Sequence, residues 1–297
     1  MRAAVLVSSL LLAGGGPARE VRYVFGTVAE IRATSLEEPG RALSDAFGRM
    51  SELESSLSIW DHRSEISRLN RAGETLLPPD AFHAVELALE IAGASGGAFD
   101  PTLEANGYLR VRLEPATRRV RLEPGSTLEL GAIAKGCAVD LALASLRAAG
   151  ASSALVDLGT SSIAVFGEEP VVFEVRNPGG GPPPAVFRMR EGAVGSSSGD
   201  QRAGHVRDPK TGAEARSVAA VTVVAASAAE ADALSTAVFV MGPEKGLALL
   251  EERGAGGLVL VEEGEGLVLR TTRGFAARYA LEVAEGVRIV DSAAAPR

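Results

Sequence analysis

Cysteine is nearly absent from this chain of 297 residues, because Cys137 is the only one. A single cysteine excludes any disulfide within the molecule. Cys137 lies in an apolar stretch, which favours a small buried hydrophobic residue over a nucleophile. Hydrophobic residues nevertheless make up 46% of the sequence, which is ample for a large core. The composition therefore predicts a globular protein without internal disulfides.

Runs of lysine or arginine are also absent, and the formal net charge is -8. Nucleic acids and anionic membranes both require a basic face on the protein that binds them. The charge balance therefore argues against either as a partner. A polyanionic small molecule would need a local source of positive charge.

The N-terminal region lacks a hydrophobic run long enough to span a bilayer. Its apolar stretch, Ala3 to Ala13, has 11 residues, against the roughly 20 that a spanning helix needs. The preceding Arg and the small residues that follow are typical of a secretory signal, so residues 1–19 are expected to direct export to the periplasm or the outer face of the cytoplasmic membrane. A frayed apolar tail is the alternative. No cysteine lies there, which excludes the usual attachment of a lipoprotein.

Residues 20–290 are expected to form one domain, and residues 291–297 a C-terminal tail.

Apolar periodicity predicts an α+β fold, with mixed sheets packed against helices. Helices and strands come in mixed groups with hairpins, which disfavours the strict alternation of a doubly wound sheet. Helices are expected at 41–57, 79–93, 134–148, 229–241 and 244–253. Strands are expected at 21–34, 170–177, 218–226, 257–263 and 266–272, with further strands inside 152–167 and 185–199.

The stretch ELGAIAKGCAVDLA (129–142) places glycines and a lysine at a predicted step from strand to helix. Glycine lets the backbone approach a ligand closely, and a helix N-terminus carries free N–H groups with about half a positive charge. Gly131, Lys135 and Gly136 together therefore indicate a site for a phosphate group.

Asp232 and Thr236 are four residues apart in a predicted helix, so their oxygens lie on one face. Such hard donors suit Mg²⁺ or Ca²⁺, and the lack of a nearby Cys or second His argues against zinc. Mg²⁺ takes about 6 oxygens, so the Ala132 carbonyl, phosphate oxygens and water would have to complete the set. The alternative is an exposed Asp232 with Thr236 bonded back to its own helix, and spacing alone favours that alternative.

The stretch GAFDPT (97–102) holds a candidate carboxylate. Pro101 denies helical geometry to Asp100, which fixes the carboxylate in an extended or turn conformation beside the aromatic ring of Phe99. The alternative is an ordinary Asx turn before a short helix, and this stretch taken singly favours it.

Two more stretches hold single candidates. In SIWDHRSEISRLN (58–70), the only tryptophan, Trp60, lies in a predicted loop and either stacks on a planar ligand or covers a core edge. In HVRDPKTG (205–212), His205 is one of only three histidines and could act as a base near neutral pH. A single histidine is more often structural, and Asp208 to Gly212 is typical of a type I turn.

The order of the motifs WxxxSExSRLN, GxFDPT, ELGAIAKGxAVD, HxxDPxTG and ADALSTAVFVMG closely resembles the ApbE family, the FAD:protein FMN transferases. The resemblance covers roughly residues 21 to 270. It implies an ApbE-like α+β fold and an enzyme that binds FAD, uses Mg²⁺ and transfers FMN to a threonine or serine hydroxyl of an acceptor protein, with release of AMP. The acceptors it implies are flavoprotein subunits of exported or membrane-bound redox systems.

The resemblance also implies a role for each matching residue. The metal ligands would be the Ala132 carbonyl and the side chains of Asp232 and Thr236. Lys135 and the start of its helix would hold the diphosphate of FAD. His205 would contact the flavin end or accept the proton of the acceptor hydroxyl. The residues implied to contact the nucleotide are Phe25, Trp60, Ala98, Phe99, Asp100 and Glu129.

Some positions depart from the family pattern. Phe25 replaces the usual Met, Trp60 the usual Tyr, and Glu129 an Asp that is one methylene shorter, while residues 159–163 lack an aspartate that many relatives carry. Two alternative functions stay open: an Mg²⁺-dependent FAD pyrophosphatase, in which water replaces the acceptor hydroxyl, and a non-catalytic exported flavin-binding protein. The intact metal triad and lysine favour the transferase, because a binding protein needs neither.

Overall fold

The structure is a computed structural model that describes residues 17–199, 206–215, 218–264 and 266–292. Within these ranges no helix combines the length and apolar character needed to cross a membrane. Residues 1–16 of the expected signal segment lie outside the described part, and Ala18 already begins the first strand. Export of the protein stays a prediction.

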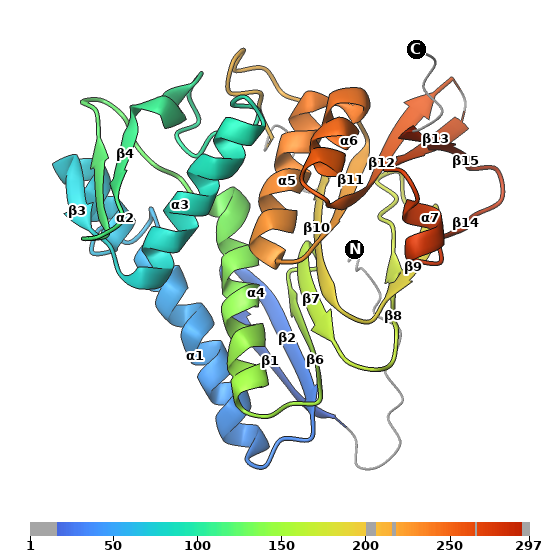
Figure 1. The fold of residues 1–297 in the computed structure, drawn as a ribbon, viewed down its shortest axis with the longest axis horizontal. Helices are drawn as coiled ribbons and strands as arrows, with labels where there is room; N and C mark the ends of the chain where they lie inside the picture. Colours follow the sequence, from blue (N-terminus) through green and yellow to red (C-terminus); the bar gives the residue numbers. More distant parts are fainter. Residues whose placement is uncertain (1–16, 200–205, 216–217, 265, 293–297) are drawn as a thin grey trace.

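A nine-stranded sheet organises the molecule, with the strand order β1-β2-β6-β7-β10-β11-β12-β13-β15 (Figure 1). Neighbouring strands run antiparallel except β13 and β15, which run parallel. The strands are β1 (Ala18–Val24), β2 (Thr27–Thr34), β6 (Ser153–Leu158), β7 (Ser162–Phe166), β10 (Gly192–Ser198), β11 (Ala220–Ala225), β12 (Gly256–Glu263), β13 (Gly266–Thr271) and β15 (Arg288–Asp291).

The large sheet separates two hydrophobic cores. Strand β7 shows why: Ala164 and Phe166 point into the main core with the helices, whereas Ile163 and Val165 point into the second core. The main core packs against α1 (Pro39–Leu57), α3 (Pro79–Ala94), α4 (Gly131–Ala148), α5 (Ala228–Met241) and α6 (Pro243–Glu252). The second core is closed by β8 (Val171–Glu174), β9 (Ala185–Met189), β14 (Glu282–Val283) and α7 (Phe275–Arg278).

A third, three-stranded sheet lies with α2 at the end of the molecule beside α3 (Figure 1). The Ser64 hydroxyl begins α2 by accepting the Ser67 N–H at 3.0 Å, and Gly73 ends it in the left-handed conformation, with a φ of 76°. The elements here are α2 (Glu65–Ala72), β3 (Glu74–Leu76), the 3₁₀ helix η1 (Gly107–Arg110), β4 (Val111–Glu114) and β5 (Arg119–Leu122).

The predicted α+β class is confirmed, and so are the predicted helices, which differ only at their ends. The single strand predicted at 21–34 is wrong, because the chain reverses within it. Phe25 and Gly26 both have positive φ values, 54° and 68°, and form the turn between β1 and β2. Part of the loop predicted at 58–70 is the helix α2. The expected helix at 134–148 begins three residues earlier, so Lys135 lies inside α4 rather than at its turn.

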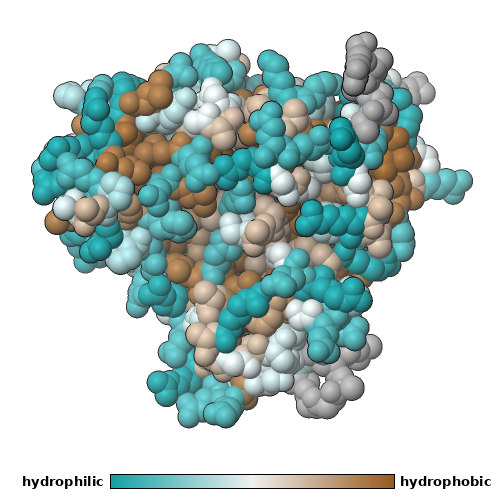
Figure 2. All heavy atoms as spheres, in the orientation of Figure 1, coloured by the Kyte–Doolittle hydropathy of each residue, from teal (hydrophilic) through white to brown (hydrophobic). Residues whose placement is uncertain are grey.

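Hydrophilic residues spread over the whole face shown in Figure 2, and hydrophobic atoms are visible between them. Many surface charges are paired, as in the ion pair between Arg19 and Glu30 at 2.7 Å. Most large apolar side chains are buried, but 91% of Trp60 is exposed.

Candidate functional site

The two stretches expected to carry the phosphate and metal sites meet where α4 crosses α5. Gly136 of α4 lies directly against Ala228 of α5, and a Cβ at position 136 would overlap the Ala228 carbonyl. The glycine is therefore needed for close packing of two helices, not for approach to a ligand as the sequence pattern indicated. This close crossing brings Lys135 and Asp232 together from positions 97 residues apart in the sequence.

Asp232 is the central polar group at this crossing. The Nζ of Lys135 lies 3.4 Å from each carboxylate oxygen, and the Gly136 N–H donates to Oδ2 at 3.1 Å. The side chain of Asp232 is only 5% exposed, whereas that of Lys135 is 26% exposed. Burial raises the pKa of Asp232 above its usual range, and the Lys135 charge and the Gly136 N–H oppose that rise. The prediction of an exposed Asp232, given as the alternative, is wrong.

The Ala132 carbonyl belongs to the first turn of α4, near the crossing with α5. Helical geometry directs the carbonyl of residue i at the N–H of residue i+4, which for Ala132 is the N–H of Gly136. Because that N–H also donates to Asp232 Oδ2, the Ala132 and Asp232 oxygens surround one donor. Convergence of the Ala132 carbonyl with the Asp232 carboxylate on a metal stays a prediction.

Thr236 lies one turn after Asp232 on α5. Its hydroxyl donates to the Asp232 carbonyl at a long 3.5 Å, so the predicted back-bonding to its own helix is present. Hydroxyl lone pairs remain free to accept or to coordinate in that geometry. Spacing places the hydroxyl on the Asp232 face of the helix.

The donor set at this crossing fits Mg²⁺. It consists of a carboxylate, a hydroxyl and a main-chain carbonyl, all hard oxygens. Asp232 uses one N–H and one lysine, which leaves acceptor capacity on a carboxylate with about four lone-pair positions. In the described ranges there is no cluster of three or more His, Cys, Asp or Glu residues that could hold a metal, so a zinc-type site is not found there.

Strand β10 packs against α5 at the turn that holds Asp232. A Cβ at Gly195 would overlap the Ala231 carbonyl, so the strand and the helix backbone are in contact. Ser197 and Ser235 share a hydrogen bond of 2.8 Å, and the Ser235 hydroxyl also donates to the Asp232 carbonyl at 2.8 Å. Sequence reasoning missed this support, although three consecutive serines at the end of a strand were visible.

Glu129 lies at the start of α4. Its carboxylate accepts the Gly131 N–H at 2.8 Å, and its own N–H donates to the Pro101 carbonyl at 2.7 Å. The expected nucleotide segment 98–100 is thus tied to the helix start through the residue that follows it. Asp100 is buried and accepts the Thr102 N–H at 2.9 Å, the Thr102 hydroxyl at 2.7 Å and the Tyr108 N–H at 3.2 Å.

These contacts confirm the predicted Asx turn at Asp100. Ala98 and Phe99 are buried too, with 7% and 3% exposed, and the ring of Phe99 belongs to the main core. The ring therefore presents no open aromatic face. Contact of these three residues with a nucleotide stays a prediction.

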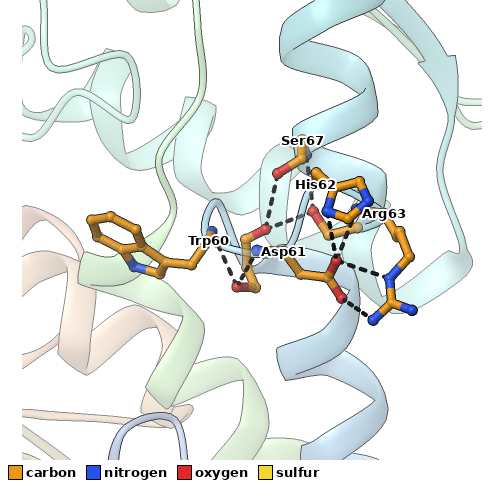
Figure 3. A network of polar contacts seen from close by, with 7 residues as sticks. Trp60, Asp61, His62, Arg63 and Ser67 are labelled. Carbon is orange, nitrogen blue, oxygen red and sulfur yellow. Dashed lines mark hydrogen bonds and ion pairs between the residues drawn. The ribbon is translucent and has the colours of Figure 1, made fainter.

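Trp60 is held out into solvent by an ordered turn (Figure 3). The Ser58 hydroxyl accepts the N–H groups of Trp60 and Asp61, both at 3.3 Å, and the Ser58 carbonyl accepts the hydroxyls of Ser64 and Ser67. Figure 3 shows the indole directed away from this network. The alternative that Trp60 covers a core edge is wrong, whereas stacking on a ligand stays a prediction.

Phe25 is partly buried against the main core at the tip of the β1–β2 hairpin. Its N–H is hydrogen-bonded to the Glu54 carboxylate of α1, and partial burial raises the pKa of Glu54. Sequence reasoning did not find Glu54, because it lies in a helix with no motif around it.

His205 lies outside the described residues. The turn that follows is described: the Gly212 N–H donates to the Asp208 carbonyl at 2.8 Å, and Asp208 Oδ1 accepts the Lys210 N–H at 2.9 Å. A Cβ at Gly97 would lie 3.9 Å from the Lys210 side chain, so this turn is close to the segment that holds Asp100. The expected turn is confirmed, and a role for His205 stays a prediction.

Comparison with known proteins identifies the family of this chain. The model of the ApbE family matches residues 25–109 and 103–259. A FAD:protein FMN transferase from Treponema pallidum is 33% identical, covering 84% of this chain and 88% of its own. An ApbE protein of known structure from Thermotoga maritima has a TM-score of 0.76 at 26% identity, covering 91% of this chain and 97% of its own.

The flavin transferase ApbE from Vibrio cholerae has a TM-score of 0.78 at 20% identity, covering 88% of this chain and 99% of its own, and shows the shared fold. The family match extends over the α4 and α5 segments that form the crossing. The chain therefore belongs to the ApbE family and is a transferase.

Proposed function

We propose that this chain transfers FMN from FAD to a threonine or serine hydroxyl of an acceptor flavoprotein, in an Mg²⁺-dependent reaction that releases AMP. The acceptor oxygen bonds to the phosphorus on the FMN side of the diphosphate, and the bond from that phosphorus to the AMP oxygen breaks. The acceptor hydroxyl loses its proton, and AMP leaves with the bonding pair. The observation that carries the proposal is the contact of Lys135 and the Gly136 N–H with the buried Asp232 carboxylate at one helix crossing.

Phosphoryl-group transfer depends mainly on positioning and charge neutralisation, so the protein has little covalent work to do. The Ala132 carbonyl, Asp232 and Thr236 would hold Mg²⁺, which when bound would neutralise charge on the diphosphate. Lys135 is partly exposed beside them and can turn from Asp232 to phosphate oxygens. In a chain with a net charge of -8, this lysine is the local positive charge that an anionic substrate requires.

The same proposal gives roles to Trp60 and His205. Trp60, exposed and held by its turn, forms an aromatic wall for the flavin. His205 contacts the flavin end or accepts the acceptor proton. The acceptor is a subunit of an exported or membrane-bound redox system. This chain is itself exported, so it can reach that acceptor.

The test is to incubate the purified chain with FAD, Mg²⁺ and a candidate acceptor, and to look for a fluorescent covalent band on a denaturing gel. The proposal expects a band that is absent with EDTA and absent when the acceptor residue is alanine. Free FMN with an unlabelled acceptor would instead show a pyrophosphatase. Retention of FAD at one equivalent with no AMP released would show a flavin-binding protein.

A further inference from the structure

The first turn of α5 is tied to α4 by a carboxylate that the proposed reaction does not use. Asp140 of α4 accepts the Ala228 N–H through Oδ1 at 2.7 Å and the Ala229 N–H through Oδ2 at 2.9 Å. The Ser227 hydroxyl accepts the Glu230 N–H at 3.2 Å. The Ser227 carbonyl accepts the next N–H of the helix, at 3.1 Å. The three N–H groups of Ala228, Ala229 and Glu230, which have no acceptor within the helix, are thus satisfied, two of them by another helix.

Asp140 and Asp232 make reciprocal contacts across the crossing. Asp140 lies one turn after Gly136 on α4 and accepts N–H groups of α5. Asp232 lies one turn after Ala228 on α5 and accepts the Gly136 N–H of α4 at 3.1 Å. Each helix therefore presents a carboxylate to the backbone of the other, on either side of the point where Gly136 meets Ala228.

Gly136, Ala228 and Ala229 at the centre of this crossing have little or no side chain, so they do little to fix how far one helix is displaced along the other. Close contact of Gly136 with Ala228 and Ala229 allows the approach but offers no large side chain that interlocks. Hydrogen bonds from N–H groups to a charged carboxylate are directional and stronger than neutral ones. The two hydrogen bonds of Asp140 therefore help to set the register of α5 against α4.

We propose that Asp140 is a positioning residue for the candidate metal site, an inference that rests on the proposed function. By holding the start of α5, it keeps the Asp232 carboxylate one turn away against Gly136 and Lys135. Asp140 itself acts only through α5 and does not touch substrate.

The test compares Asp140→Ala and Asp140→Asn with the matched control Ser227→Ala. The control removes a capping hydrogen bond of α5 but leaves the hydrogen bonds between α5 and Asp140 of α4 in place. In the ligand-free protein, the amide NMR resonance of Gly136 should shift and its hydrogen exchange should accelerate in Asp140→Ala. Both should stay unchanged in Ser227→Ala. The Mg²⁺ concentration that half-saturates FAD binding should rise about 10-fold or more in Asp140→Ala, the range seen when supporting residues of metal sites are removed.

Asp140→Asn retains one carbonyl oxygen as an acceptor and should give an intermediate Mg²⁺ response. It also keeps the test decisive if the alanine variant does not fold. The inference is overturned if the aspartate variants bind FAD with the wild-type Mg²⁺ dependence, or if Ser227→Ala changes that dependence as much. Wild-type FMN transfer that persists in EDTA would instead contradict the proposed function, so the two failures are distinguishable.

Discussion

At the scale of single residues, Asp232 shows how the candidate site can keep a buried carboxylate available to a cation. A buried carboxylate is costly unless it is paired and hydrogen-bonded, and here a lysine and one backbone N–H meet it. That arrangement leaves an acceptor that a cation can use. Burial raises the pKa of this group, so its charged form is the costly one in the folded protein.

Asp232→Asn should therefore separate catalysis from folding. We expect at least a ~100-fold loss of FMN transfer, in the range found when a single group that stabilises transition-state charge is removed. The melting temperature should stay close to that of the wild type, and some FAD should still bind. Transfer rate, thermal melting and equilibrium dialysis with FAD measure the three quantities. Undiminished transfer would remove Asp232 from the site.

Trp60 can be followed directly because it is the only tryptophan in the chain. If the flavin stacks on this exposed indole, FAD binding should quench most of the tryptophan emission. Trp60→Tyr should keep an aromatic wall and weaken FAD binding less than Trp60→Ala does. Saturating FAD, confirmed by dialysis, with unchanged tryptophan emission would place the flavin elsewhere.

Asp157 predicts a pH dependence of stability. Burial raises its pKa from 3.8 to about 6, opposed by the Thr160 N–H, which it accepts at 2.8 Å. Between those values the folded state keeps a proton that the unfolded chain has released, so the free energy of unfolding falls as pH rises from about 4 to about 6. Asp157→Asn keeps the acceptor for Thr160 and should be more stable at neutral pH, by up to about 3 kcal/mol.

Urea unfolding of wild type and Asp157→Asn at several pH values tests this prediction. The two proteins should be equally stable below about pH 4 and diverge above it. A variant that is less stable than wild type at neutral pH would show that the charged carboxylate contributes favourably.

The sequence predicted that Lys135 and Asp232 belong to one site, and the structure brings them together for reasons of helix packing that the sequence did not reveal. Lys135, Asp232 and Thr236 were found because their residue types and spacing suit a phosphate and a hard cation. Gly136 was interpreted as a ligand contact, and helix packing is the reason for it. Asp140 could not be found, because its partners are backbone N–H groups of another helix, and these leave no trace in composition or spacing.

At the scale of elements, the crossing of α4 and α5 holds the candidate site together. Gly136→Ala should destabilise the protein by about 1–3 kcal/mol, because the added methyl overlaps the Ala228 carbonyl in a packed interface. The same variant should lose FMN transfer, because the Gly136 N–H would move away from Asp232.

Gly48→Ala is the matched control. Gly48 lies inside α1, and a Cβ there would meet nothing within 4 Å. Alanine is the better helix former by about 1 kcal/mol, so this variant should be at least as stable as wild type. Denaturant midpoints of both variants give the comparison. Equal effects of the two substitutions would contradict close packing at the crossing.

The long helices were predictable, and most of the shortest strands were not. The helix at 41–57 has apolar residues at steps of three and four, and α1 has that stripe buried. Strands β3, β4, β5, β14 and β15 were missed because they have at most four residues, too few for alternation to stand out. The β1–β2 hairpin was missed because its turn uses Phe25 at a positive φ, a position that glycine usually takes.

At the scale of the whole molecule, one large sheet supports the site from a single side. Strand β10 contacts α5 beneath Asp232, and α4 packs on the same face of the sheet. The other face carries a separate core with β8, β9 and α7, which does not include the site residues. The family fold was predictable from the order of five motifs, but the depth at which each motif residue lies was not.

The most direct test of the account is the Mg²⁺-dependent labelling of an acceptor protein, compared between wild type and Asp232→Asn by intact-protein mass spectrometry. The account predicts that wild type adds the mass of one FMN less water to the acceptor, with one AMP released per label, and that EDTA or the variant abolishes both. Labelling by the variant at the wild-type rate, or labelling by wild type in EDTA, would contradict it.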